Sequence, residues 1–381
     1  MTASLFDRSD YPTLRGSVYL NQASLGLIGQ PSVAAMHAFL DGVARHGNLY
    51  LSDTDEVSLC DAIRESSSRL LHADKQQVAI VTSASEILGQ LPFLFKRKLN
   101  STVVVVSSDF PAITRPWLRQ AALNNCRLQF VYDTAERDLT ETLVDAIDDT
   151  TGVVAVSNVQ YATGSSVDVF RLRQSTAQVG ARLIVDATQA AGAINVDATG
   201  WAADMVVASG YKWLGGHGGV ALAVLSRDLL EEIPAFPGWM GAPDPFAFDA
   251  TSLSMADGAR RYTQSTMSYV SIVGLEVSIR QLLLLGEARI EAHARRLASM
   301  LVEEASKYGW QPFRSIVSET ASPHIVSLGH PSRNAAATLE RLRGRNIVCS
   351  VRGGCIRVSL APYNDVTDVC ALIEALGSTE D

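Results

Sequence analysis

The sequence lacks features that would direct it to a membrane, to nucleic acid or into a disulfide framework. No apolar run reaches the roughly 18 residues of a membrane helix, and the N-terminus lacks the layout of a signal peptide. The net charge is −8 and the basic residues form no stripe, which argues against nucleic-acid binding. The five cysteines show no CxxC spacing, so we expect neither disulfides nor zinc, and we favour a reducing cytoplasm.

Two common nucleotide-binding motifs are also missing. There is no GxxxxGK loop, and the glycines at 215–219 do not form GxGxxG. The 381 residues are instead 47% hydrophobic and 19% charged, as in ordinary globular proteins. A chain of this length can form a large core and more than one lobe.

Short β-branched segments alternate with helix-like stretches through the first two thirds of the chain. Six of them are nearly continuous in apolar residues, which predicts strands buried on both faces: QVAIV, STVVVVSSD, GVVAVSNV, ARLIVDAT, DMVVASG and GVALAVL. This alternation predicts an α/β fold with a mostly parallel sheet. A long helix and a smaller α+β pattern follow. We therefore predict an N-terminal segment (1–40) that packs with the lobes, a large domain (41–265) and a small domain (266–381).

Polar residues at predicted strand ends point to a site, because ligands bind at the carboxyl ends of parallel strands. Asp186 follows one apolar strand and Lys212 follows the next. A buried ion pair is one interpretation of the two residues. The other is pyridoxal 5′-phosphate (PLP) chemistry, in which a desolvated lysine forms a Schiff base and an aspartate keeps the pyridine nitrogen protonated.

A strand followed by a small-residue turn and a helix start, VTSASEILGQL, is a candidate phosphate cradle. Free N–H groups and the helix dipole favour an anion there. Taken alone, Ser83 or Ser85 is better interpreted as an ordinary helix cap.

The string VDATQAAGAINVDATGWAADMVVASGYKWLGG resembles a known cofactor-binding region. It is similar to the cofactor region of the class V aminotransferase family, which includes cysteine desulfurases, kynureninases and the isopenicillin N epimerase group. Weaker similarity extends from YLNQASLG to IRVSLAPYN. The resemblance implies the PLP-dependent transferase fold of aspartate aminotransferase, with a mostly parallel seven-stranded sheet in the large domain and a smaller α+β domain at the C-terminus.

The resemblance also implies roles for individual residues around PLP. Lys212 would hold the cofactor as a Schiff base, Asp186 would pair with the pyridinium, and Gln189 would hydrogen-bond the ring oxygen. The remaining contacts would come from phosphate-binding and ring-contacting positions, namely Ala84, Ser85, Ser209, Tyr211, Phe110 and Tyr161. Core packing is the alternative role for Phe110.

Substrate and partner residues follow from the same resemblance. Arg357 matches the arginine that binds the α-carboxylate of an amino-acid substrate, Arg352 would assist it, and Asn21 falls in a segment near the substrate. A guanidinium suits this role because it binds a carboxylate bidentately and does not titrate. Thr266 matches a threonine that reaches the phosphate of the neighbouring subunit, so the resemblance implies a homodimer with a shared site.

The sequence departs from the desulfurases at two positions. Phe110 stands where they carry a histidine, and the interval between Arg352 and Arg357 is too short for their mobile cysteine loop. Cys355 in that interval is interpreted as a structural cysteine. We therefore predict a lyase that breaks a C–S bond by β-elimination and does not form a persulfide. Transamination and epimerisation stay open because they share the same carbanion, and a non-catalytic PLP-binding protein is a third possibility.

The aromatic loop at residues 236–255 fits a substrate entrance or a dimer contact equally well.

Overall fold

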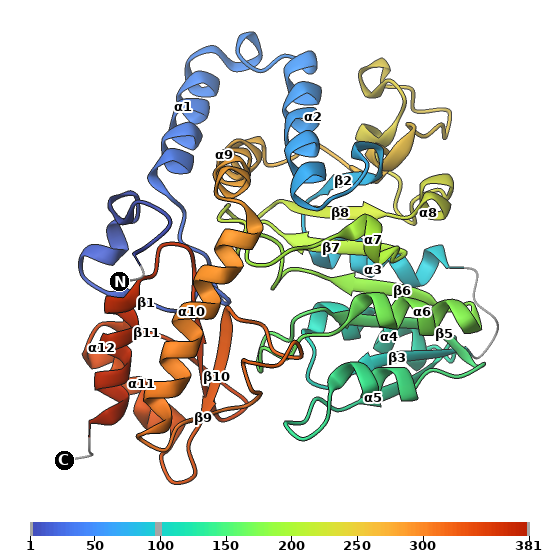
Figure 1. Cartoon of the computed structure of the whole chain (residues 1–381). Coiled ribbons are helices and arrows are strands. Elements are labelled where there is room, and N and C mark those ends of the chain that lie inside the picture. The colour runs from blue at the N-terminus through green and yellow to red at the C-terminus, as the bar shows by residue number, and fades with distance from the viewer. Residues whose placement is uncertain (1–2, 96–100, 379–381) are drawn as a thin grey trace.

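A computed structural model describes residues 3–95 and 101–378 of the chain (Figure 1). Its centre is a seven-stranded sheet in the order β2-β8-β7-β6-β5-β3-β4. The strands are β2 (Val78–Val81), β3 (Thr102–Val106), β4 (Arg127–Val131), β5 (Thr151–Ser157), β6 (Arg182–Asp186), β7 (Met205–Ser209) and β8 (Ala221–Leu225). Strands β4, β3, β5, β6 and β7 run parallel, while β8 is antiparallel to both β7 and β2. The predicted mostly parallel seven-stranded sheet is confirmed.

The strand that was not recognised individually is β4, at the edge of the sheet. Most of its side chains are exposed or half-buried, so it lacks the continuous apolar pattern by which the other six were identified. An edge strand has one neighbour and less cover, and its composition reflects this.

Helices cover both faces of the sheet. They are α1 (Gln30–His46), α2 (Asp53–Leu70), α3 (Ala84–Leu94), α4 (Pro111–Ala122), α5 (Leu139–Asp145), α6 (Val169–Val179), α7 (Ala198–Trp201), α8 (Arg227–Glu231) and α9 (Tyr269–Leu285). Alternate residues of each strand enter two separate cores. Val104 and Val206 pack in one with α2, α6 and α9, while Val105 and Val207 pack in the other with α3 and α4. Burial on both faces explains why these strands are apolar throughout.

A second, smaller layer lies at the C-terminal end of the chain. It contains α10 (Glu287–Ser306), β9 (Gln311–Pro312), β10 (Ile325–Gly329), α11 (Ala335–Gly344), β11 (Ile347–Val348), β12 (Ser350–Arg352), β13 (Cys355–Ser359) and α12 (Val366–Gly377). Four of these strands form an antiparallel sheet in the order β12-β13-β10-β9, while β11 pairs with β1 near the N-terminus. One face of this sheet packs on α10, α11 and α12 in a third core.

Helix α9 shares the core of the large sheet, and α10 contributes most of its buried apolar side chains to the third core. The predicted border at residue 266 therefore precedes a helix that packs with the large sheet, and the exact domain boundaries stay a prediction.

Within the described residues, no single helix has the length and apolar character to cross a membrane; only the pair α9 and α10, bent by 79°, meets those two criteria together.

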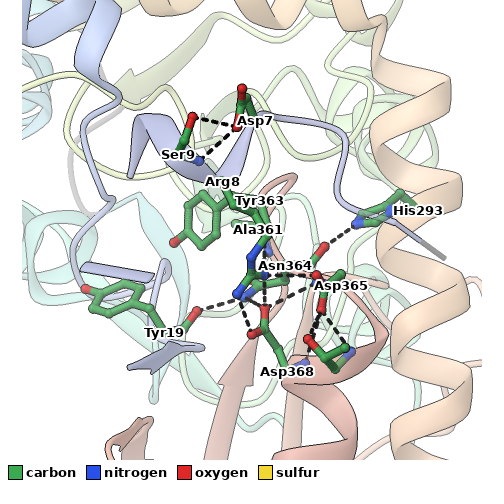
Figure 2. Close-up of polar contacts among 11 residues, drawn as sticks. Asp7, Arg8, Ser9, Tyr19, His293, Ala361, Tyr363, Asn364, Asp365 and Asp368 are labelled. Carbon is green, nitrogen blue, oxygen red and sulfur yellow. Dashed lines mark hydrogen bonds and ion pairs between the residues drawn. The ribbon is translucent and has the colours of Figure 1, made fainter. Parts of the chain in front are cut away.

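The N-terminal segment is attached to the small lobe. Strand β1 (Val18–Tyr19) pairs in parallel with β11. Figure 2 shows Arg8 binding both carboxylate oxygens of Asp368 and the carbonyl of Tyr363, with Asn364 linking Asp368 to the Tyr19 carbonyl. This buried network fixes the start of the chain against α12.

Candidate active site

A cavity lies at the carboxyl ends of the parallel strands, with an empty volume of about 480 Å³ that includes its opening to solvent. This size is typical of small-molecule sites. Its walls come from β5, β6, β7 and the start of α3 and α4. The lining residues are Ser83, Ala84, Ser85, Phe110, Ala112, Ser157, Tyr161, Asp186, Thr188, Gln189, Ser209, Tyr211 and Lys212. Nine of the residues predicted from the sequence are therefore brought together here.

Lys212 follows β7 on a loop and is only 6% exposed. Burial lowers its pKa to about 8, with the nearby Arg357 and Arg352 acting in the same direction and Asp186 acting against them. The Nζ atom lies 5.2 Å from the centre of the Phe110 ring. An amine held this way loses its proton near pH 8, well below the usual range of a lysine, which favours its use as a nucleophile.

Asp186 ends β6 and is also buried. Burial raises its pKa, although hydrogen bonds from Thr188 and the charge of Lys212 oppose the shift. Among the described residues no ion pair within 4.0 Å joins Asp186 to Lys212 or to another cation. The simple buried ion pair is therefore not formed, and the carboxylate is left to accept a cationic N–H such as that of a pyridinium.

The start of α3 faces the same cavity. Ser83 is the helix cap, because its Oγ accepts a hydrogen bond from the Glu86 N–H at 3.1 Å. Ala84 and Ser85 are the first helical residues, whose N–H groups have no partner within a helix. Ser209 and Tyr211 line the cavity with them. Backbone donors, hydroxyls and the positive helix end together suit a phosphate.

Two aromatic rings form a wall of the cavity. Phe110 is 38% exposed, so its role is not simple core packing. The Phe110 and Tyr161 rings meet edge to face at 5.6 Å. Buried Asp109 connects the two segments that carry these rings, since its carboxylate accepts hydrogen bonds from the Phe110 N–H at 2.6 Å, from the N–H and hydroxyl of Ser157, and from Gln160 Nε2 at 3.2 Å.

Gln189 reaches the cavity from the turn after β6. Its Oε1 accepts a hydrogen bond from the Trp213 indole at 2.8 Å, and its Nε2 donates to the Ala23 carbonyl at 3.1 Å. Its carbonyl accepts a hydrogen bond from the buried His324 at 2.5 Å. The orientation of the amide is thus set, and its second N–H remains for a ligand oxygen.

Arg357 lies beside the cavity, outside its lining, and is only 1% exposed. Its Nη1 donates to the Tyr161 carbonyl at 2.7 Å, and its Nη2 donates to Ser24 Oγ and, at 3.5 Å, to Asn21 Oδ1. Burial and Arg352 lower the pKa of Arg357 to about 10, so it is still charged at neutral pH. Among the described residues no carboxylate pairs with it, so this buried cation is not neutralised by the protein.

Arg352 and Thr266 are predicted site residues that do not line the cavity. Arg352 ends β12, is half-buried and adds a second positive charge near Lys212 and Arg357. Thr266 is exposed, lies between Tyr262 and α9, and does not line the cavity of its own chain. The structure brings the other predicted residues to one place and leaves Thr266 apart from them.

Thr188 and Ser157 line the cavity but were not singled out from the sequence. Thr188 is in the DATQ string, so its hydroxyl at a strand end was a usable signal. In the segment YLNQASLG, Asn21 was predicted to lie near the substrate, but Gln22 and Ser24 were not singled out. The segment carries no strand or helix pattern, and only tertiary contacts connect these two residues with Lys212 and Arg357.

PLP fits this arrangement. A buried amine with a lowered pKa, a buried carboxylate without an ion-pair partner and a helix start face one cavity, as a pyridine ring that bears an aldehyde and a phosphate requires. The residues that would hold it are Lys212, Asp186, Gln189, Ser209 and the first turn of α3.

A family model described as Aminotransferase class-V matches residues 18–372. The chain belongs to this family. It is a PLP-dependent enzyme of lyase or transferase type. YcbU, an uncharacterized aminotransferase of Bacillus subtilis, is 24% identical over 372 residues, covering 97% of this chain and 96% of the relative. A probable cysteine desulfurase of Methanothermobacter thermautotrophicus is 25% identical over 398 residues, covering 97% and 96%.

Solved structures share the fold. The cystine C–S lyase C-DES, in complex with its reaction product cysteine persulfide, has a TM-score of 0.87 at 18% identity, covering 96% of this chain and 99% of C-DES. A C-DES variant with glycine covalently linked to its PLP cofactor has a TM-score of 0.88, also at 18% identity, covering 98% and 100%.

Proposed function

We propose that the chain catalyses β-elimination of a cysteine-derived amino acid. The bond between the β-carbon and sulfur breaks, and R–S–CH2–CH(NH3+)–COO− with one water gives a thiol, pyruvate and ammonium. The supporting observation is the short hairpin between β12 and β13. Arg352 pairs with Cys355 across only Gly353 and Gly354, which both have positive φ. Cys355 is thus a strand residue without a loop that would carry its sulfur to a substrate.

When bound, the cofactor withdraws electrons from the α-carbon of the substrate. Individual residues of the chain have separate roles in the reaction. Lys212 would hold the cofactor covalently, and its free Nζ would accept the α-proton of the substrate; a pKa of about 8 suits this base. Asp186 would keep the ring nitrogen protonated. Arg357 would bind the α-carboxylate, since its buried charge has no acidic partner among the described residues.

The desulfurase relatives weigh against one part of this proposal, the exclusion of persulfide formation. A single assay separates the two reactions. Purified protein is incubated with cysteine and a panel of S-substituted cysteines, and thiol, sulfide, pyruvate and alanine are measured. We expect thiol and pyruvate in equal amounts. Alanine with a persulfide on Cys355, detected by mass spectrometry and abolished in Cys355→Ala, would instead identify a desulfurase.

Amino-group transfer is the second candidate, favoured by the relative YcbU. A transaminase converts its bound PLP to the amine form when it meets an amino acid, and a keto acid reverses the change. Stopped-flow absorbance with the same amino-acid panel therefore tests it. A complete and reversible half-reaction without pyruvate release would replace β-elimination by transamination.

We also propose that the active form is a homodimer. Thr266 supports it, since this predicted phosphate contact is exposed and outside the cavity of its own chain. Sedimentation analysis gives the oligomeric state. PLP affinity in Thr266→Val tests the contact, with Thr251→Val as the exposed control.

A further inference from the structure

Lys212 lies on a loop, outside any regular element. Strand β7 ends at Ser209 and β8 begins at Ala221. The pairing continues only to the Gly210 N–H, which donates to the Val220 carbonyl at 3.0 Å, so Tyr211 and Lys212 lie beyond it. Within this loop the Lys212 carbonyl accepts a hydrogen bond from the Gly215 N–H at 3.0 Å. The position of the lysine backbone therefore depends on contacts from other parts of the chain.

The N-terminal segment from Asn21 to Gly26 supplies such contacts. Gln22 Nε2 donates to the same Lys212 carbonyl at 2.8 Å. The Gly26 N–H donates to the Tyr211 carbonyl at 3.0 Å. Here a side chain at position 26 is excluded, because its Cβ would lie 2.3 Å from the Lys212 oxygen. The two chain segments are thus in direct backbone contact.

The Gln22 amide is held on its other side by the small lobe. Its Oε1 accepts hydrogen bonds from the Tyr363 hydroxyl at 2.7 Å and from the Leu27 N–H at 3.2 Å. Gln22 is 4% exposed and Tyr363 is 2% exposed. The Tyr363 carbonyl in turn accepts from Arg8, which binds Asp368 (Figure 2). A continuous chain of contacts, buried at Gln22 and Tyr363 and partly buried at Arg8, therefore runs from α12 to the lysine.

We propose that Gln22 is a positioning residue for Lys212, which couples the loop of the lysine to the N-terminal segment and the small lobe. The inference rests on the proposed role of Lys212 as the residue that binds the cofactor. An unanchored loop lets Nζ leave its buried position, and a displacement of about 1 Å costs about 10²-fold in rate.

The test compares Gln22→Met with Gln120→Met. Methionine keeps the volume and removes the amide. Gln120, on α4, is equally buried (3%) and binds Asn125 away from the cavity. The first readout is the pH dependence with which an acylating reagent labels Lys212 in the apoprotein, followed by peptide mass spectrometry. The second is the PLP dissociation constant, and the third is kcat and KM with the amino acid identified in the panel above.

In Gln22→Met we expect the labelling midpoint to rise from near 8 by about one unit, because the released amine meets water. PLP affinity should fall about tenfold, and kcat about 10²-fold with little change in KM. Gln120→Met should lose stability without these changes. A folded Gln22→Met protein with wild-type midpoint, PLP affinity and kcat would overturn the proposal.

Two further variants keep the outcome interpretable. If Gln22→Met does not fold, Tyr363→Phe removes only the hydroxyl that holds Gln22 Oε1, and it should shift the same readouts in the same direction by less; unchanged values would again reject the inference. Lys212→Ala, treated with PLP and borohydride, tests the underlying assignment. If the variant still forms the covalent adduct at wild-type yield, the proposed function fails, whatever Gln22 does.

Discussion

The large lobe and the small lobe hold their sides of the site in different ways. Asp186 and Ser209 end strands whose two faces are both buried, so the ladder and two cores fix them. Arg357 lies on β13, where only alternate residues such as Ile356 and Val358 enter a core. Its guanidinium is instead held by Tyr161, Ser24 and Asn21, from two distant parts of the chain. The strand-end residues of the cofactor side are therefore fixed by the large sheet, whereas Arg357, like the loop of Lys212, depends on contacts with the N-terminal segment.

The largest effect should come from the cofactor side. Lys212→Ala removes both the covalent attachment and the proposed base, so we expect the rate of product formation to fall about 10⁴-fold. The measurement is pyruvate release under saturating substrate. Lys75→Ala, an exposed lysine on the same lobe, should have wild-type activity, and equal loss in both variants would contradict the assignment.

The burial of the lysine also predicts a pH dependence of stability. The pKa of Lys212 is lowered from about 10.5 to about 8 in the folded apoprotein, so its charge destabilises the fold fully below pH 8. This destabilisation disappears as pH rises through 8 toward 10.5, because the unfolded chain then binds more protons. Apo Lys212→Met should therefore be more stable than wild type at pH 7, by up to about 3 kcal/mol.

Denaturant unfolding of both apoproteins at pH 7 and pH 10.5 measures this difference. The advantage of Lys212→Met should shrink at the higher pH. If the difference in free energy of unfolding between the two proteins were independent of pH, the buried charge of Lys212 would not destabilise the folded state.

On the substrate side, Arg357→Lys should raise KM about 10²-fold with a smaller change in kcat, since an ammonium does not reproduce a bidentate guanidinium. Initial rates over a range of substrate concentrations give both constants. The exposed Arg343, changed to Lys, is the control. A fall in kcat at constant KM would instead place Arg357 with the cofactor side.

The smallest effect should come from Ser24→Ala. Ser24 Oγ occupies a donor of Arg357 that a substrate carboxylate also needs, so removing the hydroxyl should lower KM about threefold. The same kinetic assay measures it, with the exposed Ser58→Ala as reference. An increase in KM would show that Ser24 helps to bind the substrate and does not compete with it.

The pattern of strands predicted the mostly parallel sheet, and the family resemblance supplied the cofactor and the nine lining residues. Both signals can be found in the sequence because buried strands and cofactor motifs are runs of neighbouring residues. Edge strand β4 was not identified individually because its side chains are partly solvated. Gln22 and Ser24 were missed because a residue in an irregular segment reveals nothing about its partners 190 and 333 positions away.

The sequence by itself determined the family, the cofactor and the lysine, because the string from Asp186 to Lys212 resembles the cofactor region of the class V aminotransferases in both residue types and spacing. Only the tertiary structure decided that Lys212 and Asp186 are not an ion pair, that Arg357 is buried without an acidic partner in the described chain, and that the N-terminal segment lies on the lysine loop. The physical reason is that burial and desolvation depend on which distant segments exclude water from a group, and this is fixed only when the two lobes and the N-terminal segment have packed.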